Sequence, residues 1–299
     1  MITEVAPGIK FIKAEGQGFP YCHSLLIEDE LRVVIETGAG NNAYAPEGLE
    51  SIDMLLNTHY HKDHTWGNEL FVNARILMHR LDYPPMVDET SRDLYTGFFQ
   101  WDEIMQVPRG PIRQSSGSAL APFVPARVDG FFTEGEIIHF GRLKAQVLHL
   151  PGHTPGHCGF YFENEGLLFA GDIDLIPFGP HYGDYLSNLD DFRSSIKQVR
   201  EINPRIYCCS HRRPITENII EQIDTYYNKT LEREGRLKEL LTEPKTVKDL
   251  VGKCVVYPGY EHPYYPFWEH RMIEKHLDSM MKRDEVELVE SDKYQLKAR

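Results

Sequence analysis

The amino-terminal part of the chain alternates short β-branched and aromatic runs with turn residues, a pattern that predicts β-strands. Three strands are expected in the runs GIKFIKA, CHSLLIE and LRVVIET, with a hairpin turn at Asp29-Glu30. The run SIDMLLNT then predicts a buried strand that ends at His59, and a helical segment around Asn68 to Val72 precedes a further strand, RILMH. An antiparallel start is therefore followed by β-α-β order.

The periodic pattern is lost from about Leu81 to Arg127, where the runs YTGFFQW and RGPIRQSSGSALAPFVP are rich in aromatic residues, Pro, Gly and Ser. A long segment without regular structure inside a compact domain is usually functional, so residues 81–127 are predicted to be an insertion that forms a lid or a dimer surface. Strands resume in EIIHF, LKAQVLHL, CGFYFE, GLLFAG and RIYCCS, and an amphipathic helix is expected from Leu189 to Ile202. The pattern predicts an α+β fold with two sheets flanked by helices.

After Pro214 the pattern becomes helical. One long helix with an apolar stripe is expected from Glu217 to about Leu241. It is followed by TVKDLV, a Pro- and Tyr-rich loop, the helix EHRMIEKHLDSMMKR and two strands joined around Ser291-Asp292. This order is the outline of a small winged-helix module. We therefore predict a catalytic domain at residues 1–215 and a winged-helix-like domain at residues 216–299.

The composition narrows the function classes. Of the 299 residues 41% are hydrophobic and 26% charged, which is typical of a folded domain, and no apolar run reaches the roughly 18 residues of a membrane span. Lys+Arg 32 against Asp+Glu 45 gives a net charge of −13, which disfavours nucleic acid as a partner. Five cysteines without a CxxC pair indicate reduced, mostly buried thiols, and the absence of a secretory signal pattern at the amino terminus predicts a cytoplasmic protein.

The chemistry lies in residues 58–67, THYHKDHTWG, where the predicted buried strand ends. Three imidazoles and one carboxylate (His59, His61, Asp63 and His64) fall within six residues. Imidazole and carboxylate ligands suit Zn²⁺ or Fe, and such a mixed set is typical of a catalytic metal site. Three further strand ends follow in order, at PGHTPGH with His153, at AGD with Asp172 and at SH with His211.

These motifs resemble the metallo-β-lactamase superfamily, and in particular its glyoxalase-II-like branch, over about residues 1–215. The resemblance implies a four-layer αββα sandwich and a binuclear centre that holds two divalent metal ions. It assigns His59, His61 and His153 to the first ion, Asp63, His64 and His211 to the second, and Asp172 to both, with Asp63 and Asp172 as the catalytic carboxylates. Zn is the expected metal, with Fe and Mn as alternatives. Glu36 stands where the family usually has an Asp that braces the metal-bearing loop.

Further residues are candidates for the substrate pocket. His181 and Tyr182 follow Asp172 in the segment that borders the active site in this family, Cys22 and His23 lie in a loop that faces the site in relatives, and the insertion offers aromatic side chains at Phe98, Phe99 and Trp101. His157 is expected to brace the loop of His153 by a hydrogen bond, and His149 is expected to be a packing residue.

The expected reaction is hydrolysis of a small ester, thioester or lactone by a hydroxide that bridges two metal ions. A single-strand endoribonuclease is an alternative because of the winged-helix resemblance, and a mononuclear iron sulfur-dioxygenase is another because it shares the first ligand triad. The expected partner is a small-molecule substrate. No association with a membrane is expected, and a homodimer is possible from the sequence.

Overall fold

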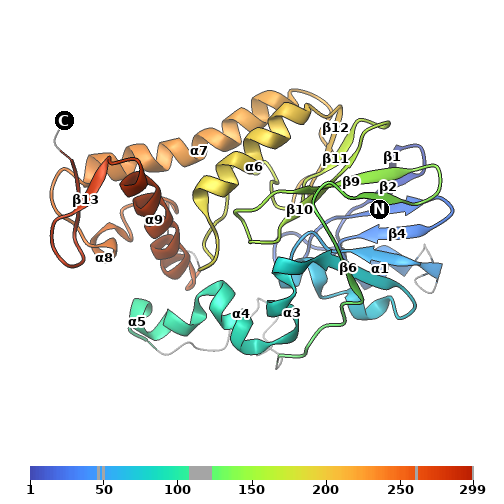
Figure 1. Cartoon of the computed structure of the whole chain (residues 1–299), viewed down its shortest axis with the longest axis horizontal. Coiled ribbons are helices and arrows are strands. Elements are labelled where there is room, and N and C mark those ends of the chain that lie inside the picture. The colour runs from blue at the N-terminus through green and yellow to red at the C-terminus, as the bar shows by residue number, and fades with distance from the viewer. Residues whose placement is uncertain (46–47, 49–50, 108–122, 260–261, 298–299) are drawn as a thin grey trace.

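A computed structural model describes residues 1–45, 48, 51–107, 123–259 and 262–297. Two β-sheets lie face to face on one side of the molecule, and long helices extend from them toward the carboxyl terminus (Figure 1). The first sheet has the order β1-β2-β3-β4-β5-β6-β7. Its strands are β1 (Ile2–Ala6), β2 (Ile9–Ile12), β3 (Ser24–Glu28), β4 (Arg32–Ile35), β5 (Met54–Leu56), β6 (Arg75–His79) and β7 (Gly130–Phe132).

This sheet changes direction part-way across. Strands β1 to β4 are antiparallel, whereas β4 to β7 are parallel. The hairpin between β3 and β4 pairs Glu28 with Arg32 and therefore confirms the turn predicted at Asp29-Glu30. The antiparallel start and the later β-α-β order of the sequence are both present in one sheet.

The second sheet has the order β12-β11-β10-β9-β8. Its strands are β8 (Ile137–His139), β9 (Lys144–His149), β10 (Cys158–Phe162), β11 (Leu167–Phe169) and β12 (Ile206–Cys208). Only β11 and β12 are parallel to each other among neighbouring strands of this sheet. The end of β9 therefore lies at the same edge as the ends of β11 and β12.

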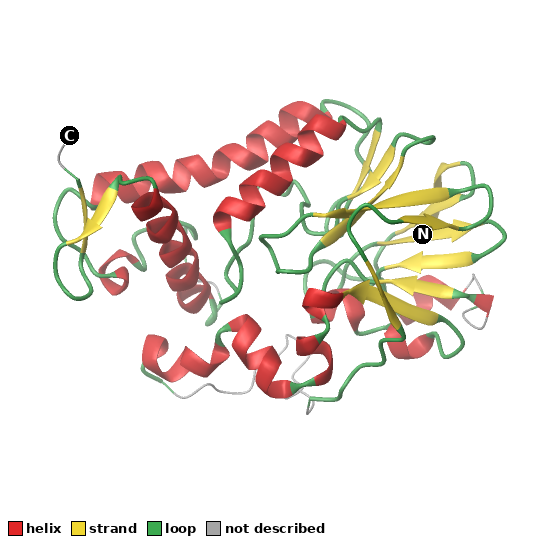
Figure 2. Ribbon diagram, viewed as in Figure 1, coloured by secondary structure: helices red, strands yellow, loops and turns green. Residues whose placement is uncertain are grey.

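The inner strands of the sheets, such as β3, β4, β10 and β11, are buried on both faces, which explains why they are apolar runs. In β3, Leu25 and Ile27 belong to the core between the two sheets, while Leu26 faces a second core under the short helix α1 (Asn41–Tyr44). In β11, Phe169 faces the core between the sheets, and Leu168 faces the helices α6 (Leu189–Ile202) and α7 (Ile219–Leu240). Helix, sheet, sheet and helix form the four layers of the predicted αββα sandwich (Figure 2).

The helix predicted at Leu189 to Ile202 is confirmed as α6. The Asn188 side chain accepts hydrogen bonds from the backbone of Asp190 and Asp191 at its start, and Asn203 ends it in the left-handed region. These are the residue types that begin and end helices.

The first half of the predicted insertion is helical, and the expectation of a segment without regular structure was wrong there. It forms α3 (Pro84–Val87), α4 (Glu89–Thr96) and α5 (Trp101–Met105), with short 3₁₀ turns at Arg80–Asp82 and Phe98–Gln100. The Asp88 side chain caps α4 by accepting from Ser91 N, and Gly97 ends it with a φ of 83°. The helices are too short for a hydrophobic period to be visible in the sequence. Residues 108–122 of the insertion lie outside the described residues.

The carboxyl-terminal elements follow the predicted order: α7, α8 (Val247–Leu250), α9 (Tyr265–Lys282) and the hairpin β13 (Val286–Leu288) and β14 (Tyr294–Leu296). Helices α7 and α9 share one hydrophobic core with α6 and the outer face of the second sheet. The assignment to the winged-helix class and the domain boundary at residue 215 stay predictions. Within the described part of the chain, none of the helices is both long and apolar enough to span a membrane.

Candidate metal centre

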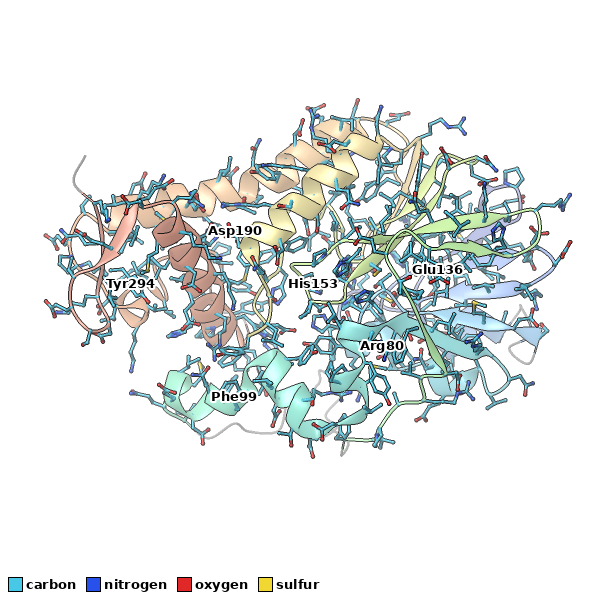
Figure 3. All side chains as sticks on the ribbon, in the orientation of Figure 1. Arg80, Phe99, Glu136, His153, Asp190 and Tyr294 are labelled. Carbon is cyan, nitrogen blue, oxygen red and sulfur yellow. The ribbon has the colours of Figure 1, made fainter. Side chains whose placement is uncertain are left out.

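The metal-ligand candidates come together where strands of both sheets end. The segments after β5, β9, β11 and β12 carry, in order, the 59–64 motif, His153, Asp172 and His211, and the motif ends in the short helix α2 (Lys62–Thr65). The edge that these strand ends share lies between the sheets and the carboxyl-terminal helices, and Figure 3 shows His153 there. Residues far apart in the chain therefore meet at one place.

The first group contains His59, His61, His153 and Asp172, whose ligand atoms all lie within 4.8 Å of one another. His153 Nε2 is 3.0 Å from His61 Nδ1 and 3.3 Å from Asp172 Oδ2. His59 Nε2 is 3.9 Å from the same oxygen. Three imidazole nitrogens and one carboxylate oxygen thus converge on a single point.

The second group contains Asp63, His64 and His211. The Nε2 atoms of His64 and His211 each lie 3.5 Å from Asp63 Oδ2. They lie 3.2 and 3.3 Å, respectively, from Asp172 Oδ1. The two oxygens of Asp172 therefore face different groups, as the bridging role predicted for this residue requires.

Several of these atoms have no hydrogen-bond partner among the described residues although they are buried. They are His59 Nε2, His64 Nε2 and Asp172 Oδ1. Buried polar atoms without a partner are rare in proteins because each costs about 1–3 kcal/mol. A cation in each group would satisfy them, and nitrogen and carboxylate oxygen are suitable donors for Zn²⁺ or Fe. The residues therefore fit two divalent metal ions.

Comparison with known proteins supports this geometry. The family model described as the metallo-beta-lactamase superfamily matches residues 18–211, the segment that holds all seven ligand candidates. The chain belongs to the metallo-beta-lactamase superfamily. A metallo-beta-lactamase family protein from Thermus thermophilus shares the fold with a TM-score of 0.78 and 20% identity, over 98% of this chain and 100% of that one. A beta-lactamase domain protein from Burkholderia ambifaria has a TM-score of 0.71 and 17% identity, over 99% and 93%.

The matches to curated relatives cover a smaller share of both chains. The hydroxyacylglutathione hydrolase of Haemophilus influenzae is 28% identical over 156 residues, or 50% of this chain and 65% of that protein. The acyl-coenzyme A thioesterase of Bos taurus is 25% identical over 201 residues, or 59% and 66%. The chain therefore matches less than two thirds of the length of either relative. Glyoxalase-II-like and thioesterase members of the superfamily are both among its relatives.

Hydrogen-bond partners outside the metal centre determine which ring nitrogen of His59, His61 and His153 faces the centre. Thr58 Oγ1 is 2.8 Å from His59 Nδ1, and the carbonyl of His181 accepts from His153 Nδ1 at 2.8 Å. Both rings are thereby turned with Nε2 toward the centre. The opposite holds for His61, because its Nε2 lies 2.7 Å from Asp184 Oδ2 and its Nδ1 is left for the metal. Such outer partners fix ring orientation and raise ligand basicity.

Glu36 braces the metal-bearing loop from within the core. It is fully buried, its Oε1 accepts from Thr58 N at 2.6 Å, and its Oε2 lies 3.0 Å from His64 Nδ1. The longer side chain therefore performs the bracing that the family usually assigns to Asp. Its φ of 64° lies in the left-handed region, which is unusual for Glu.

His157 makes structural contacts in two directions, with the start of the His153 loop, as expected, and with the Asp172 segment. It accepts from Asp172 N at 3.0 Å through Nε2 and lies 2.9 Å from the carbonyl of Leu150 through Nδ1. The contact needs the glycine at position 171, because a Cβ there would lie 2.5 Å from His157 Nε2 and φ is 55°.

Charges around the centre favour cation binding. Burial raises the pKa of Asp63, but His64 and His211 outweigh it and hold this pKa at about 2. Burial lowers the pKa of His211, but Asp172 and Asp63 outweigh it and raise the pKa to about 9. Burial holds the pKa of His59 well below its usual range. The carboxylates are therefore ionised at neutral pH, and a cation at the second group competes with a proton on His211.

The two pocket residues predicted near the amino terminus, Cys22 and His23, have different surroundings. Cys22 is 1% exposed beside His64, and burial raises the pKa of its thiol to about 12, so the thiol packs in the core and does not line a pocket. His23 is half-buried, and its Nδ1 accepts from Ala14 N at 2.9 Å. Its own backbone N–H donates to the carbonyl of Ser210 at 2.7 Å, which places it next to His211.

On the other side of the centre, the two predicted pocket residues His181 and Tyr182 take different positions. The half-buried His181 ring lies 6.1 Å from His153 and 5.6 Å from Trp268 of α9. Tyr182 was predicted to line the pocket, and this is wrong: it is 0% exposed and belongs to the core under the second sheet. Its hydroxyl lies 2.7 Å from His276 Nε2 of α9 and accepts from Arg233 Nη1 at 3.0 Å, and these contacts hold the ring in the core.

The aromatic residues of the insertion pack mainly on α9. Trp101 is 5% exposed, with its ring 4.6 Å from Tyr264 and 5.0 Å from Phe267, and Phe98 lies 5.5 Å from Phe267. Trp101 is therefore a core residue and was wrongly placed in the pocket. Phe99 is 53% exposed and stays a candidate for substrate contact (Figure 3).

Three supporting residues were missed in the sequence. Asp82 accepts from Tyr60 N at 3.2 Å and from Thr154 Oγ1 and Gly156 N at 2.6 Å each, so it joins the loops of the first ligand group. Asp184 orients His61 and also accepts from the Tyr60 hydroxyl. Arg233 of α7 contacts the loop after Asp172. Asp184 follows closely after His181, but no spacing rule marked it. Asp82 and Arg233 stand among other charged residues, such as Arg80 for Asp82 and Glu232 and Glu234 for Arg233, so nothing in the sequence singles them out.

Proposed function

We propose that the chain is a binuclear metal-dependent hydrolase that cleaves small esters, thioesters or lactones, with thioesters as the first choice. The observation that carries the proposal is the carboxylate of Asp172, whose two oxygens face two separate ligand groups at 3.2 to 3.9 Å. A site of this form would hold two cations side by side, and among the described residues it contains no nucleophilic side chain.

When bound in such a site, divalent ions would supply Lewis acidity toward a carbonyl oxygen and would make a water molecule more acidic. The protein contributes orientation and charge. Asp172 and Asp63 provide negative charge between and beside the groups, and the outer contacts of His59, His61 and His153 hold three rings in fixed directions. Because these directions are set before substrate binds, little reorganisation is needed during the reaction.

Two lines of support favour a thioester. One relative is named a hydrolase of hydroxyacylglutathione and another a thioesterase of acyl-coenzyme A, and both of these compounds are thioesters. Positive charge also lies beside the second ligand group, because Lys13 and Arg213 are close enough to His23 to lower its pKa, after burial and His211. In a chain of net charge −13 this local charge favours an acidic carrier thiol.

The test is hydrolysis of a panel of thioesters, lactones and phosphodiesters by protein reconstituted with Zn²⁺, together with elemental analysis. We expect two ions per chain and preferential thioester cleavage. His59→Ala should reduce the rate by more than about 100-fold, because loss of even an outer partner costs about 10- to 100-fold. His139→Ala, on the exposed face of β8, is the matched control and should leave the rate unchanged.

A different result would refute the proposal. One iron per chain together with oxygen uptake on persulfides would favour the sulfur-dioxygenase alternative. Cleavage of single-stranded RNA that is lost in the Asp63→Ala variant would favour the ribonuclease.

A further inference from the structure

A loop between Asp172 and α6 supports two histidines of the first ligand group. We call residues 176–187 the support loop. The carbonyl of His181 accepts from His153 Nδ1 at 2.8 Å, and Asp184 Oδ2 lies 2.7 Å from His61 Nε2. The position of this loop therefore sets the direction in which His153 Nε2 and His61 Nδ1 point.

The support loop contains no helix or strand, so its backbone carbonyls need partners from other elements. Arg233 of α7 supplies several of them. Its Nη2 donates to the carbonyl of Phe178 at 2.7 Å, and its Nη1 donates to the carbonyl of Pro180 at 2.6 Å and to the Tyr182 hydroxyl at 3.0 Å. The next carbonyl along the chain after Pro180 is that of His181, which orients His153.

Helix and loop are packed in direct contact at this point. Gly179 has a φ of 87°, and a Cβ on it would lie 2.6 Å from the Cβ of Lys229, one turn before Arg233. Arg233 itself is only 3% exposed. The loop therefore cannot move relative to α7 without breaking the contacts of the guanidinium group.

The hydrogen bonds that the described residues show for Arg233 all go to neutral oxygens. The neighbouring buried Arg193 is different, because it forms an ion pair with Glu234 at 2.8 Å. Burial of a cation is costly, and a carboxylate is the usual compensation. A planar group with fixed donors is nevertheless well suited to hold two carbonyls and a hydroxyl in one arrangement.

Helix α7 also reaches the bridging ligand. The Tyr226 hydroxyl donates to the backbone carbonyl of Asp172 at 3.1 Å, and Tyr226 is 2% exposed. The same helix thus contacts the backbone of Asp172 and the support loop, although it contributes no metal ligand.

We infer that Arg233 is a positioning residue of the first metal site: by holding Phe178 and Pro180 it fixes the support loop, and through His181 and Asp184 it fixes His153 and His61. The inference rests on the binuclear centre of the proposed function but not on its substrate. It assigns the carboxyl-terminal helices a part in metal binding, in addition to their part in packing.

The experiment compares the Arg233→Met variant with the full-length wild type in chelator competition for Zn²⁺, where the two binding steps are measured separately. Loss of an outer partner costs about 10- to 100-fold in affinity, and Arg233 acts through one more residue, so we expect about 10-fold weaker binding in one step and no change in the other. Arg236→Met is the matched control. Arg236 lies on the same helix and donates to the carbonyls of Cys254 and Val255, at 3.0 and 3.2 Å, but these belong to the segment after α8, which carries none of the ligand candidates.

Arg233→Lys keeps the buried charge and serves if the Met variant fails to fold. A lysine provides a point charge and cannot hold both carbonyls in the same arrangement, so the same binding step should weaken. Unchanged affinity in folded Arg233→Lys, or an equal loss in both steps, would overturn the inference. Thioester hydrolysis by the wild type is scored separately, so a failure of the proposed reaction is distinguishable from a failure of this inference.

Discussion

Replacement of Glu36 by Asp tests how the second ligand group is oriented. The carboxylate of Glu36 makes two contacts in the core, with Thr58 N at 2.6 Å and with His64 Nδ1 at 3.0 Å. Aspartate keeps the charge but is shorter by one carbon–carbon bond, about 1.5 Å. Without a backbone shift, the shorter side chain can satisfy at most one of the two partners.

The magnitude follows from which contact is lost: the contact with Thr58 N is a hydrogen bond, whereas the contact with His64 is an ion pair. A buried group left without its hydrogen bond costs about 1–3 kcal/mol. Asp tolerates the left-handed φ of 64° better than Glu does, and this difference stabilises the variant by less than about 1 kcal/mol of unfolding free energy. The net loss of unfolding free energy is therefore about 1–2 kcal/mol. If His64 loses its brace, the affinity of the second site should fall by about 10- to 100-fold.

The assay is urea unfolding together with stepwise Zn²⁺ binding. Glu232→Asp, an exposed residue of α7, is the control for the shorter side chain and should change neither quantity. Full wild-type stability and affinity of both sites in Glu36→Asp would refute the reasoning, because it would show that the two contacts of Glu36 do not orient His64.

Metal occupancy, packing of the insertion and acid stability can each be tested as well. Asp172→Asn should lower both metal occupancies because each oxygen faces one group, whereas His211→Ala should empty mainly the second site; elemental analysis distinguishes them. Trp101→Ala should lower the unfolding free energy by about 3–5 kcal/mol because the side chain is buried against α9. Phe99 is exposed, so Phe99→Ala should change the unfolding free energy by less than about 0.5 kcal/mol and should raise KM. Equal unfolding curves for the two variants would contradict this expectation. The pKa of Glu234 is held at about 2, against burial, by His276 and Arg193, below the value of about 4.3 in unfolded chains. Its stabilisation is therefore present above about pH 4.3 and lost toward pH 2, so wild-type stability should fall more steeply than that of Glu234→Gln between pH 5 and 3, in urea unfolding of metal-free protein.

Much of the fold was encoded in local patterns. The apolar runs predicted strands correctly because strands such as β3 and β11 are buried on both faces. The helix at Leu189 to Ile202 was predicted at its observed bounds, because Asn188 and Asn203 mark its ends and its apolar face has a helical period. The candidate ligand set was proposed from imidazoles and carboxylates at successive strand ends together with the family resemblance, and the structure brings these side chains together in two neighbouring groups.

The contacts that hold those ligands were decided only by the tertiary structure. Asp82, Asp184 and Arg233 are separated from the residues they support by long stretches of chain, and none has a neighbour in the sequence that marks its role. Tyr182 and Trp101 were misplaced for the same reason, because an aromatic residue in an irregular segment packs equally well in a core or beside a substrate. Sequence spacing determines which side chains can bind a metal, whereas burial and partner distance, which depend on packing between distant segments, determine how firmly each one is held.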